Sequence, residues 1–247
     1  MRLEAASRSD TGRFRTTNED AVACATDLGL FLVSDGMGGL ANGARASRLA
    51  VETLHDYVAG AGSPAEMCAR DDPSVLAEAA RCANGRVWAE GRNGSSTEGP
   101  LSGATLVALR LCPHHRVASW VHVGDSRLYR SRDDRLELLT ADHTVAGVAH
   151  RHARAVPLDL PHSSRILQAL GVDRDVEPSV GTAALRDGDA FLLCTDGLSS
   201  AVEPADLQHA LRSWAGASEM AESLLRLALD AETRDNATLI VVRASEA

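Results

Sequence analysis

Apolar positions along the chain follow two different spacings. Short continuous apolar runs are typical of buried strands, and apolar residues three and four positions apart are typical of amphipathic helices. Two apolar runs within residues 20–34 are joined at Asp27-Leu28-Gly29, and this arrangement predicts a hairpin. Helical spacing covers residues 44–59 and 74–90. The same patterns predict further strands at 105–111, 116–123, 127–138, 189–195 and 237–243, and further helices at 204–214 and 218–231.

The order of these predicted elements favours one fold class. Strands and helices come in blocks of two or three rather than in strict alternation, which is typical of antiparallel sheets flanked by helices and not of a doubly wound parallel sheet. We therefore expect an α+β fold. The 247 residues, 45% of them hydrophobic, are enough for one large domain spanning 1–247. Residues 141–168 show no clear period, and we expect an irregular excursion there.

The net charge of the chain argues against two classes of binding partner, nucleic acids and anionic membranes. With a formal net charge of −9, the chain lacks the basic footprint that nucleic acid or an anionic membrane requires. The N-terminus lacks the apolar core of a signal peptide, and no stretch approaches the run of about 18 apolar residues that a membrane helix needs. These features predict a cytoplasmic protein. The five cysteines are scattered without a C-x-x-C pair, so we expect neither a disulfide framework nor a structural zinc site.

Acidic residues gather at the ends of predicted strands. The runs "LFLVSDG" (30–36) and "FLLCTDG" (191–197) each end in Asp-Gly. In an antiparallel sheet the start of one strand and the end of its neighbour share an edge. The acids that this rule places at one edge are Glu19, Asp20, Asp35, Asp125, Asp196 and Asp235.

Such a cluster of carboxylates has a definite chemistry. Carboxylates in a partly dry site repel one another and must take up protons or bind cations. All-oxygen ligation selects hard ions such as Mg²⁺ or Mn²⁺, and one Asp can bridge two ions about 3.5–4 Å apart. The alternative is that Asp-Gly is only a turn dipeptide. Neither Asp-Gly pair leads promptly into the second strand that a two-residue hairpin needs, which favours the metal site.

Seven motifs together resemble a known family. The chain resembles the metal-dependent protein phosphatases of type 2C, and in particular their short bacterial members. The motifs stand in the order of that family and span almost the whole chain. They are "GRFRTTNED" (12–20), "SDGMGG" (34–39), "SGATLV" (102–107), "VGDSRLYR" (123–130), "LTADHT" (139–144), "LCTDGL" (193–198) and "RDNATLIVV" (234–242).

The resemblance implies a four-layer α-β-β-α sandwich with a binuclear Mn²⁺ or Mg²⁺ centre at one end. It implies that Asp35 bridges both ions and that Asp125 belongs to a third metal site. It implies that Asp196 and Asp235 bind one ion, and that Asp20, alone or together with Glu19, binds the other ion with the Gly36 carbonyl. It further implies that Asn236 orients its neighbours and that Arg15 binds the phosphate.

The activity implied by the resemblance is hydrolysis of phosphoserine and phosphothreonine in proteins. Water or hydroxide bridging the two ions would attack phosphorus directly, without a phosphoenzyme, and the enzyme would be a monomer opposing a cognate bacterial Ser/Thr kinase. Two features depart from the family. Met37 stands where some members carry a histidine proposed as general acid, and residues 145–165 lack the usual charged, glycine-containing flap pattern. We expect a flap-like segment at about 143–165 and interpret His143, His150 and His152 as structural or exposed.

Two rival functions stay open. A pseudophosphatase or adaptor would keep the fold and only bind phosphoproteins, but the motifs retain every expected metal acid. A small-molecule phosphomonoesterase would share the same centre and differ only in its substrate.

Overall fold

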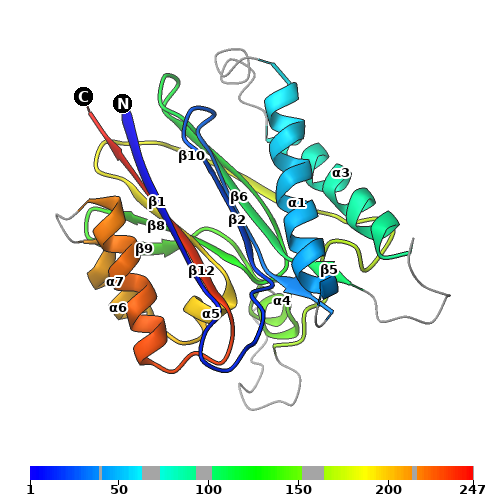
Figure 1. Cartoon of the computed structure of the whole chain (residues 1–247). Coiled ribbons are helices and arrows are strands. Elements are labelled where there is room, and N and C mark those ends of the chain that lie inside the picture. The colour runs from blue at the N-terminus through cyan, green and yellow to red at the C-terminus, as the bar shows by residue number, and fades with distance from the viewer. Residues whose placement is uncertain (39–40, 63–72, 93–101, 152–163, 213–215, 247) are drawn as a thin grey trace.

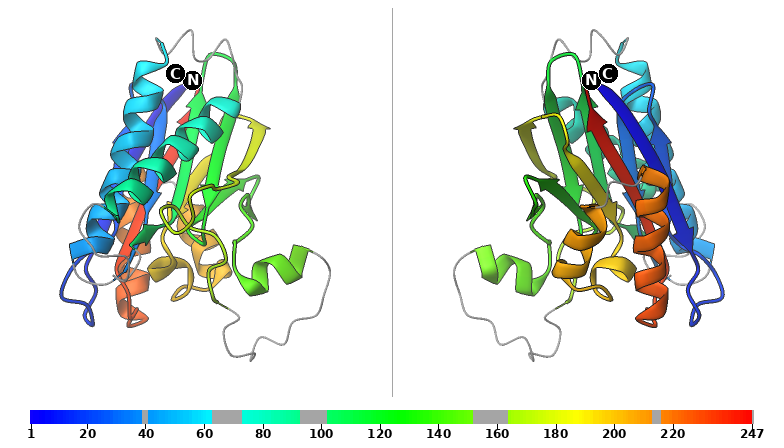
Figure 2. Two further views of the ribbon diagram at one scale, coloured as in Figure 1. Left: turned by 90° about the vertical axis from the view of Figure 1, so that its right-hand side faces the viewer. Right: turned by 90° about the vertical axis from the view of Figure 1, so that its left-hand side faces the viewer.

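Two five-stranded antiparallel sheets pack face to face and carry helices on their outer surfaces (Figures 1 and 2). The computed structural model describes residues 1–38, 41–62, 73–92, 102–151, 164–212 and 216–246. The arrangement confirms the predicted α-β-β-α sandwich.

The first sheet has the strand order β1-β12-β11-β8-β9. Helices α6 (Pro204–Leu211) and α7 (Ala217–Asp230) cover its outer face. Because β1 pairs with β12 from Arg2 opposite Ser245, the two ends of the chain lie side by side (Figure 1). The strands are β1 (Arg2–Asp10), β8 (Arg127–Arg132), β9 (Arg135–Leu138), β11 (Ala190–Cys194) and β12 (Ala237–Ser245).

The second sheet has the order β10-β7-β6-β3-β2, and α1 (Ala41–Gly60) and α3 (Ser74–Glu90) cover it. A short two-stranded sheet joins β4 (Gly36–Met37) to β5 (Gly103–Ala104). The main strands are β2 (Ala21–Ala25), β3 (Leu30–Ser34), β6 (Leu106–Cys112), β7 (Val117–Val123) and β10 (Ser179–Ala184).

The continuous apolar runs arise because the central strands are covered on both faces. In β3, Phe31 and Val33 pack between the two sheets, whereas Leu30 and Leu32 pack beneath α1 and α3. Successive side chains of a strand point to opposite faces, so a strand between two apolar layers has no polar face. All five residues of β3 are buried, and the same is true of β11.

Two strands were not predicted, and one predicted strand differs in the structure. Strands β1 and β10 were not predicted, because "RLEAASRSD" and "SVGTAA" contain few large apolar residues and are mostly half-buried or exposed. The predicted strand 127–138 is a hairpin of β8 and β9, turning at Asp133 and Asp134 with φ of 48° and 60°. Positive φ at both central residues is the requirement of the tight turn that suits twisted strands.

The expected irregular segment at about 143–165 is partly helical. Val145–Arg151 forms the short helix α4, which lies at the periphery of the molecule (Figure 2). Residues 152–163, including His152, lie outside the described residues. The remaining helix, α5 (Asp196–Ser199), follows β11 directly.

The cysteine prediction is wrong in one respect. Cys112 is disulfide-bonded, whereas Cys24, Cys82 and Cys194 are free, so the partner of Cys112 lies outside the described residues. Scattered spacing in the sequence does not reveal which cysteines approach each other in space. Separately, no helix within the described ranges has the length and apolar content needed to cross a bilayer.

Candidate metal centre

The acids predicted from the sequence lie at one end of the sandwich. Strand register explains this placement, because the start of β2 is opposite the end of β3 (Ala21 to Ser34) and Cys194 at the end of β11 is opposite Leu239 near the start of β12. Glu19 and Asp20 precede β2 and Asp35 follows β3, so these three acids lie at the same end of their sheet. The remaining acids are Asp125 after β7, Asp196 after β11 and Asp235 before β12.

Asp35 is held by its backbone. Its amide donates to the Thr105 hydroxyl at 2.9 Å, and its carbonyl accepts from the Thr105 amide at 2.8 Å. The Thr105 hydroxyl also lies 2.7 Å from the Ser126 hydroxyl, next to Asp125. Thr105, fully buried, thus connects the segment of Asp35 to the segment of Asp125. Because these bonds use backbone atoms, the Asp35 carboxylate stays available.

Two hydrogen bonds cross between the sheets at this end. The Thr195 hydroxyl donates to Asp20 Oδ2 at 2.9 Å, and the Glu19 amide donates to Asn236 Oδ1 at 2.8 Å. Asn236 donates in turn to the backbone carbonyls of Thr11 and Thr17 at 2.8 and 3.1 Å. Asn236 is 4% exposed, and its side chain hydrogen-bonds to three backbone groups, those of Thr11, Thr17 and Glu19.

Four of the acids carry a buried carboxylate oxygen with no hydrogen-bond partner. Buried polar atoms are almost always partnered, so an exception needs a specific cause. Four such exceptions in one place have a common explanation if cations complete their coordination. The four atoms are Glu19 Oε1, Asp20 Oδ1, Asp125 Oδ1 and Asp196 Oδ1.

The electrostatics of the acids show the same crowding. Burial, joined by the charges of Asp196 and Asp235 and opposed by hydrogen bonds from threonines, raises the pKa of Asp20 to about 7. Burial and the charge of Asp196 raise the pKa of Asp125 to about 7. Burial together with four neighbouring aspartates raises the pKa of Asp35 well above its ordinary value. Divalent cations would relieve both the burial cost and the repulsion.

The other three acids are shifted in pKa or paired by their neighbours. Burial raises the pKa of Asp196, with a further rise from the charge of Asp235. Burial also raises the pKa of Glu19, although the charge of Arg15 opposes the shift. Asp235 differs because Arg15 already binds it, with Nη2 donating to Oδ2 at 2.7 Å.

Gly36 has a backbone that no larger residue allows. A Cβ at Gly36 would lie 2.1 Å from the Gly43 carbonyl oxygen and 2.6 Å from that of Glu19. The Gly36 amide donates to the Glu19 carbonyl at 3.2 Å. The close approach explains glycine after Asp35, because the start of α1 and the segment before β2 meet at this point.

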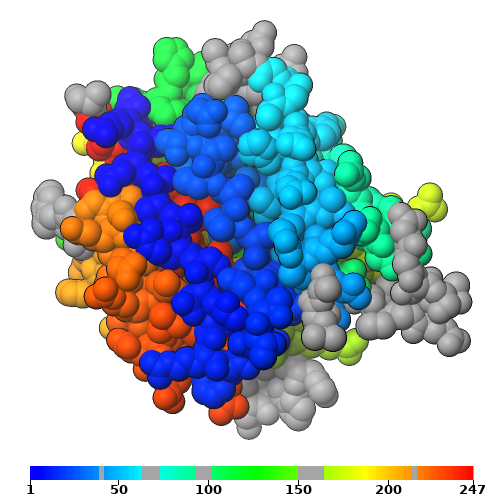
Figure 3. All heavy atoms as spheres, in the orientation of Figure 1, coloured from blue at the N-terminus to red at the C-terminus, as the bar shows by residue number. Residues whose placement is uncertain are grey.

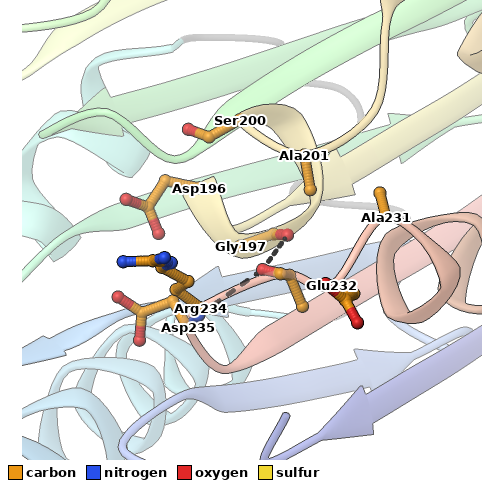
Figure 4. Close-up of a pocket in the computed structure, with 9 residues that line it drawn as sticks. Asp196, Gly197, Ser200, Ala201, Ala231, Glu232, Arg234 and Asp235 are labelled. Carbon is orange, nitrogen blue, oxygen red and sulfur yellow. Dashed lines mark hydrogen bonds between the residues drawn. The ribbon is translucent and has the colours of Figure 1, made fainter. Parts of the chain in front are cut away.

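Two hollows flank the acids. One, of about 350 Å³, is lined by Asp196, Arg234, Asp235 and neighbouring residues, and Figure 4 shows those three side chains extending toward the same side. Thr233 also lines it and donates a hydrogen bond to the Gly197 carbonyl at 2.8 Å.

The second hollow, of about 330 Å³, lies between Asp125 and Asp196. Arg127 and Asp142 line it and form a close pair, with Arg127 Nη2 donating to Asp142 Oδ2 at 2.7 Å. A substrate group entering this side would therefore meet acids of the centre together with a paired arginine.

His143 is structural, as interpreted from the sequence. It is 5% exposed, and its amide donates to the Gly124 carbonyl at 2.7 Å while the Gly124 amide donates to its Nδ1 at 3.2 Å. Because Nδ1 accepts this bond, Nε2 carries the proton and donates to the Ser179 hydroxyl at 2.9 Å. His143 thereby hydrogen-bonds to both the amide and the carbonyl of Gly124, the residue before Asp125. The backbone of His150 lies in α4.

Sequence reasoning missed the residues that hold the acids in place. Thr105, Thr195 and His143 contact the acid-bearing segments over long sequence separations, 175 residues in the pair of Thr195 with Asp20. All three stand inside quoted motifs, and that position was the one available signal.

The residues present fit hard divalent cations. The donors are carboxylates and a backbone carbonyl, which suit Mg²⁺ or Mn²⁺ and not soft metals. Among the described residues, no three acidic, histidine or cysteine side chains already form a ready coordination shell.

Comparisons with known proteins agree with this site. The profile of the family "Protein phosphatase 2C" matches residues 13–238. The chain is 34% identical to serine/threonine protein phosphatase PstP of Mycobacterium tuberculosis over 242 residues, 97% of this chain and 44% of that protein. It therefore spans less than half the length of PstP. It is 30% identical to serine/threonine phosphatase stp of Listeria innocua over 246 residues, 97% of this chain and 95% of that one.

A solved structure shows the same fold. The crystal structure of the catalytic domain of PstP in complex with two manganese ions has a TM-score of 0.84 to this chain at 32% identity, covering 99% of each. The fold, the matched profile and the curated relatives lead to one assignment. The chain belongs to the protein phosphatase 2C family.

Proposed function

We propose that the protein is a metal-dependent phosphatase that removes phosphate from phosphoserine and phosphothreonine in proteins. The single observation that carries this proposal is the set of four unpartnered buried carboxylate oxygens at one end of the sandwich. The relative that was crystallised with two manganese ions supports a centre of two Mn²⁺ or Mg²⁺ ions.

Each acid has a distinct place in the proposed centre. Asp35 lies among the other aspartates and is the best placed to serve two ions, as its pKa reflects the charges of Asp20, Asp196, Asp235 and Asp125. Asp196 and Asp235 would hold one ion, and Asp20 with Glu19 and the Gly36 carbonyl the other, with Asp125 serving a third. When bound, such ions neutralise the phosphate charge and lower the pKa of water to near neutrality.

Arg15 is proposed to bind the phosphoryl group. Its side chain is 47% exposed and is tethered by Asp235 at 2.7 Å, so its guanidinium already lies beside the acids. A guanidinium can grip two phosphoryl oxygens through parallel N–H donors. A cation held by Asp235 would compete with this guanidinium for the carboxylate, and Arg15 would then serve to position phosphorus rather than to take part in proton transfer.

The protein substrate, the opposing kinase, the monomeric state and the cytoplasmic location are parts of this proposal. The names of the relatives, which are serine/threonine phosphatases, support the class of substrate. A small-molecule phosphomonoesterase is the second candidate, and it differs only in substrate. The retained acids with unpartnered oxygens disfavour an inactive adaptor.

One assay series tests the chemistry. The protein is assayed on p-nitrophenyl phosphate, a phosphothreonine peptide and a sugar phosphate, with Mn²⁺ and with chelator. We expect Mn²⁺-dependent turnover that favours the peptide. Asp35→Ala and Asp196→Ala should abolish turnover while Asp230→Ala, an exposed acid on α7, keeps it. Turnover in chelator, or wild-type turnover in either centre variant, would contradict the proposal, and preference for the sugar phosphate would favour the second candidate.

A further inference from the structure

The loop that carries Arg15 presents an apolar side chain to solvent. Phe14 is 58% exposed, more than any other large hydrophobic residue in the part of the chain that the structure describes. Exposed Arg13 and Arg15 flank it. A single exposed apolar residue is ordinary on a protein surface. Phe14 is different because its neighbour in the chain contacts the metal centre.

A second loop lies against this one. Arg15 joins them by donating from Nη2 to Asp235 Oδ2 at 2.7 Å and from Nε to the Arg234 carbonyl at 3.4 Å. The Arg234 guanidinium carbon lies 5.9 Å from the centre of the Phe14 ring, near the outer limit of a cation–π contact. Figure 3 shows the N-terminal segment in blue beside the orange-red C-terminal segment on one face of the molecule.

Arg234 connects this pair of loops to the centre. Its side chain lines the hollow of about 350 Å³ that also contains Asp196 and Asp235 (Figure 4). The surface formed by Arg13, Phe14 and Arg234, here called the rim surface, is therefore continuous with the place where a phosphoryl group would bind. A polypeptide whose phosphorylated residue enters the centre would lie across it.

The charge of the rim surface is opposite to that of the whole chain. Neither Arg13 nor Arg234 forms an ion pair with another described residue, while the chain has a net charge of −9. Glu232 lines the same hollow, so the surface is mixed rather than uniformly basic. Arg13, next to Phe14 in the chain, and Arg234, 5.9 Å from its ring, suit a ligand with acidic and apolar groups.

We infer that the rim surface docks the polypeptide around the phosphorylated residue and selects phosphopeptides that carry acidic and apolar side chains beside it. This inference rests on the proposed phosphoprotein phosphatase function. The two arginines favour a peptide with acidic side chains, and the exposed Phe14 ring favours one with apolar side chains. A peptide with a basic residue next to the phosphorylated one would be repelled by the two arginines, which provides specificity.

The test uses the full chain with Mn²⁺ and phosphothreonine peptides of equal length flanked by Glu, Gln or Lys. For the wild type we expect kcat/KM on the Glu peptide to exceed that on the Lys peptide by about tenfold at low salt, and the ratio to shrink as salt screens exposed charges. The double substitution Arg13→Gln with Arg234→Gln should reduce the ratio to within about twofold, mainly through KM, because electrostatic docking has been removed.

Three controls make the outcome specific. Turnover of p-nitrophenyl phosphate should stay within about twofold in the single variant Arg13→Gln, because Arg13 does not line the hollow beside the acids and this small substrate has no flanking residues to dock. Arg2→Gln with Arg86→Gln, two exposed arginines elsewhere, makes the same change in net charge and should leave the peptide ratio intact. Phe14→Ser should lower kcat/KM about threefold or more on a peptide with leucine next to phosphothreonine, because an aromatic contact is lost.

The contrary results are separable. Three results would each contradict docking at the rim surface: a peptide ratio unchanged by the double variant, an equal loss of the ratio in the remote-arginine control, or a parallel loss of turnover on p-nitrophenyl phosphate in Arg13→Gln. Wild-type protein that hydrolyses p-nitrophenyl phosphate without any peptide preference would overturn it too, leaving the metal chemistry in place. Mn²⁺-loaded protein that hydrolyses neither substrate would contradict the proposed function itself.

Discussion

Thr105 and Asp35 hold each other through two hydrogen bonds, amide to carbonyl at 2.8 Å and amide to hydroxyl at 2.9 Å. The bonds join the strand end that carries the central acid to the start of β6, 70 residues away. Because the Thr105 hydroxyl also contacts Ser126, one buried side chain positions the segments of two candidate metal acids.

Thr105→Val should therefore weaken metal binding while the fold survives. Valine keeps the shape but leaves the Asp35 amide without its acceptor, at a cost of about 1–3 kcal/mol in the free energy of unfolding. Residues that orient ligands typically affect metal affinity by roughly 10- to 100-fold. Calorimetric titration with Mn²⁺ measures the effect. Thr105→Ser keeps the hydroxyl and should restore most of the affinity, and equal affinities in the valine variant and the wild type would exclude this role.

The clustered acids should destabilise the metal-free protein. Burial raises the pKa of Asp20 to about 7, so at pH 8 the folded state holds an unfavourable charge that the unfolded state solvates freely. Asp20→Asn should increase the free energy of unfolding in chelator by roughly 1–3 kcal/mol. The same variant should lose most of the stabilisation that Mn²⁺ confers on the wild type.

Urea unfolding at pH 8, with and without Mn²⁺, measures both effects. Asp230→Asn removes an exposed charge and should change stability by less than about 0.5 kcal/mol. If Asp20→Asn were destabilising in chelator, the crowding of charge at this end would be disproved.

A buried ion pair far from the centre stabilises the first sheet. Arg132 donates to both oxygens of Asp189 at 2.6 Å, and the Asp189 side chain is fully buried. Asp189→Asn leaves a largely buried guanidinium without its counter-charge, so we expect a loss of about 3–5 kcal/mol. The exposed pair of Arg116 and Glu246 is the matched control, and Glu246→Gln should cost less than about 1 kcal/mol. Similar losses in the two variants, measured by thermal unfolding, would contradict this ranking.

Glu232 ends α7 in a conformation that suits glycine. Its φ is 54°, its amide donates to the Leu229 carbonyl at 3.1 Å, and the Thr233 amide donates to the Ala228 carbonyl at 3.1 Å. These two bonds form the helix-ending motif whose left-handed residue is usually glycine. Glu232→Gly should stabilise the protein by roughly 0.5–1 kcal/mol, because the Cβ clash is removed. Glu232→Ala retains the Cβ, so a gain as large as that of glycine would refute the explanation.

Much of the fold was predictable because its signals are local. The helix at Ser74–Glu90 and the hairpin of β2 and β3 follow from spacing within their own segments. Strand β1 was missed because half-buried small and polar residues give no apolar period, and its strand conformation depends on pairing with β12 at the other end of the chain. The disulfide of Cys112 was missed for the same reason, since spatial proximity is not encoded in sequence spacing.

The sequence by itself determined which acids stand at strand ends and, through antiparallel order, that they would meet at one edge. Only the tertiary structure decided how they are held and what surrounds them. Thr105, Thr195 and Asn236 reach their acid-bearing partners across 70, 175 and 217 residues, and Arg234 approaches Phe14 only because two distant loops pack together. Such contacts depend on how whole sheets pack, because alternation along a strand sets the direction of a side chain but not its distant neighbour.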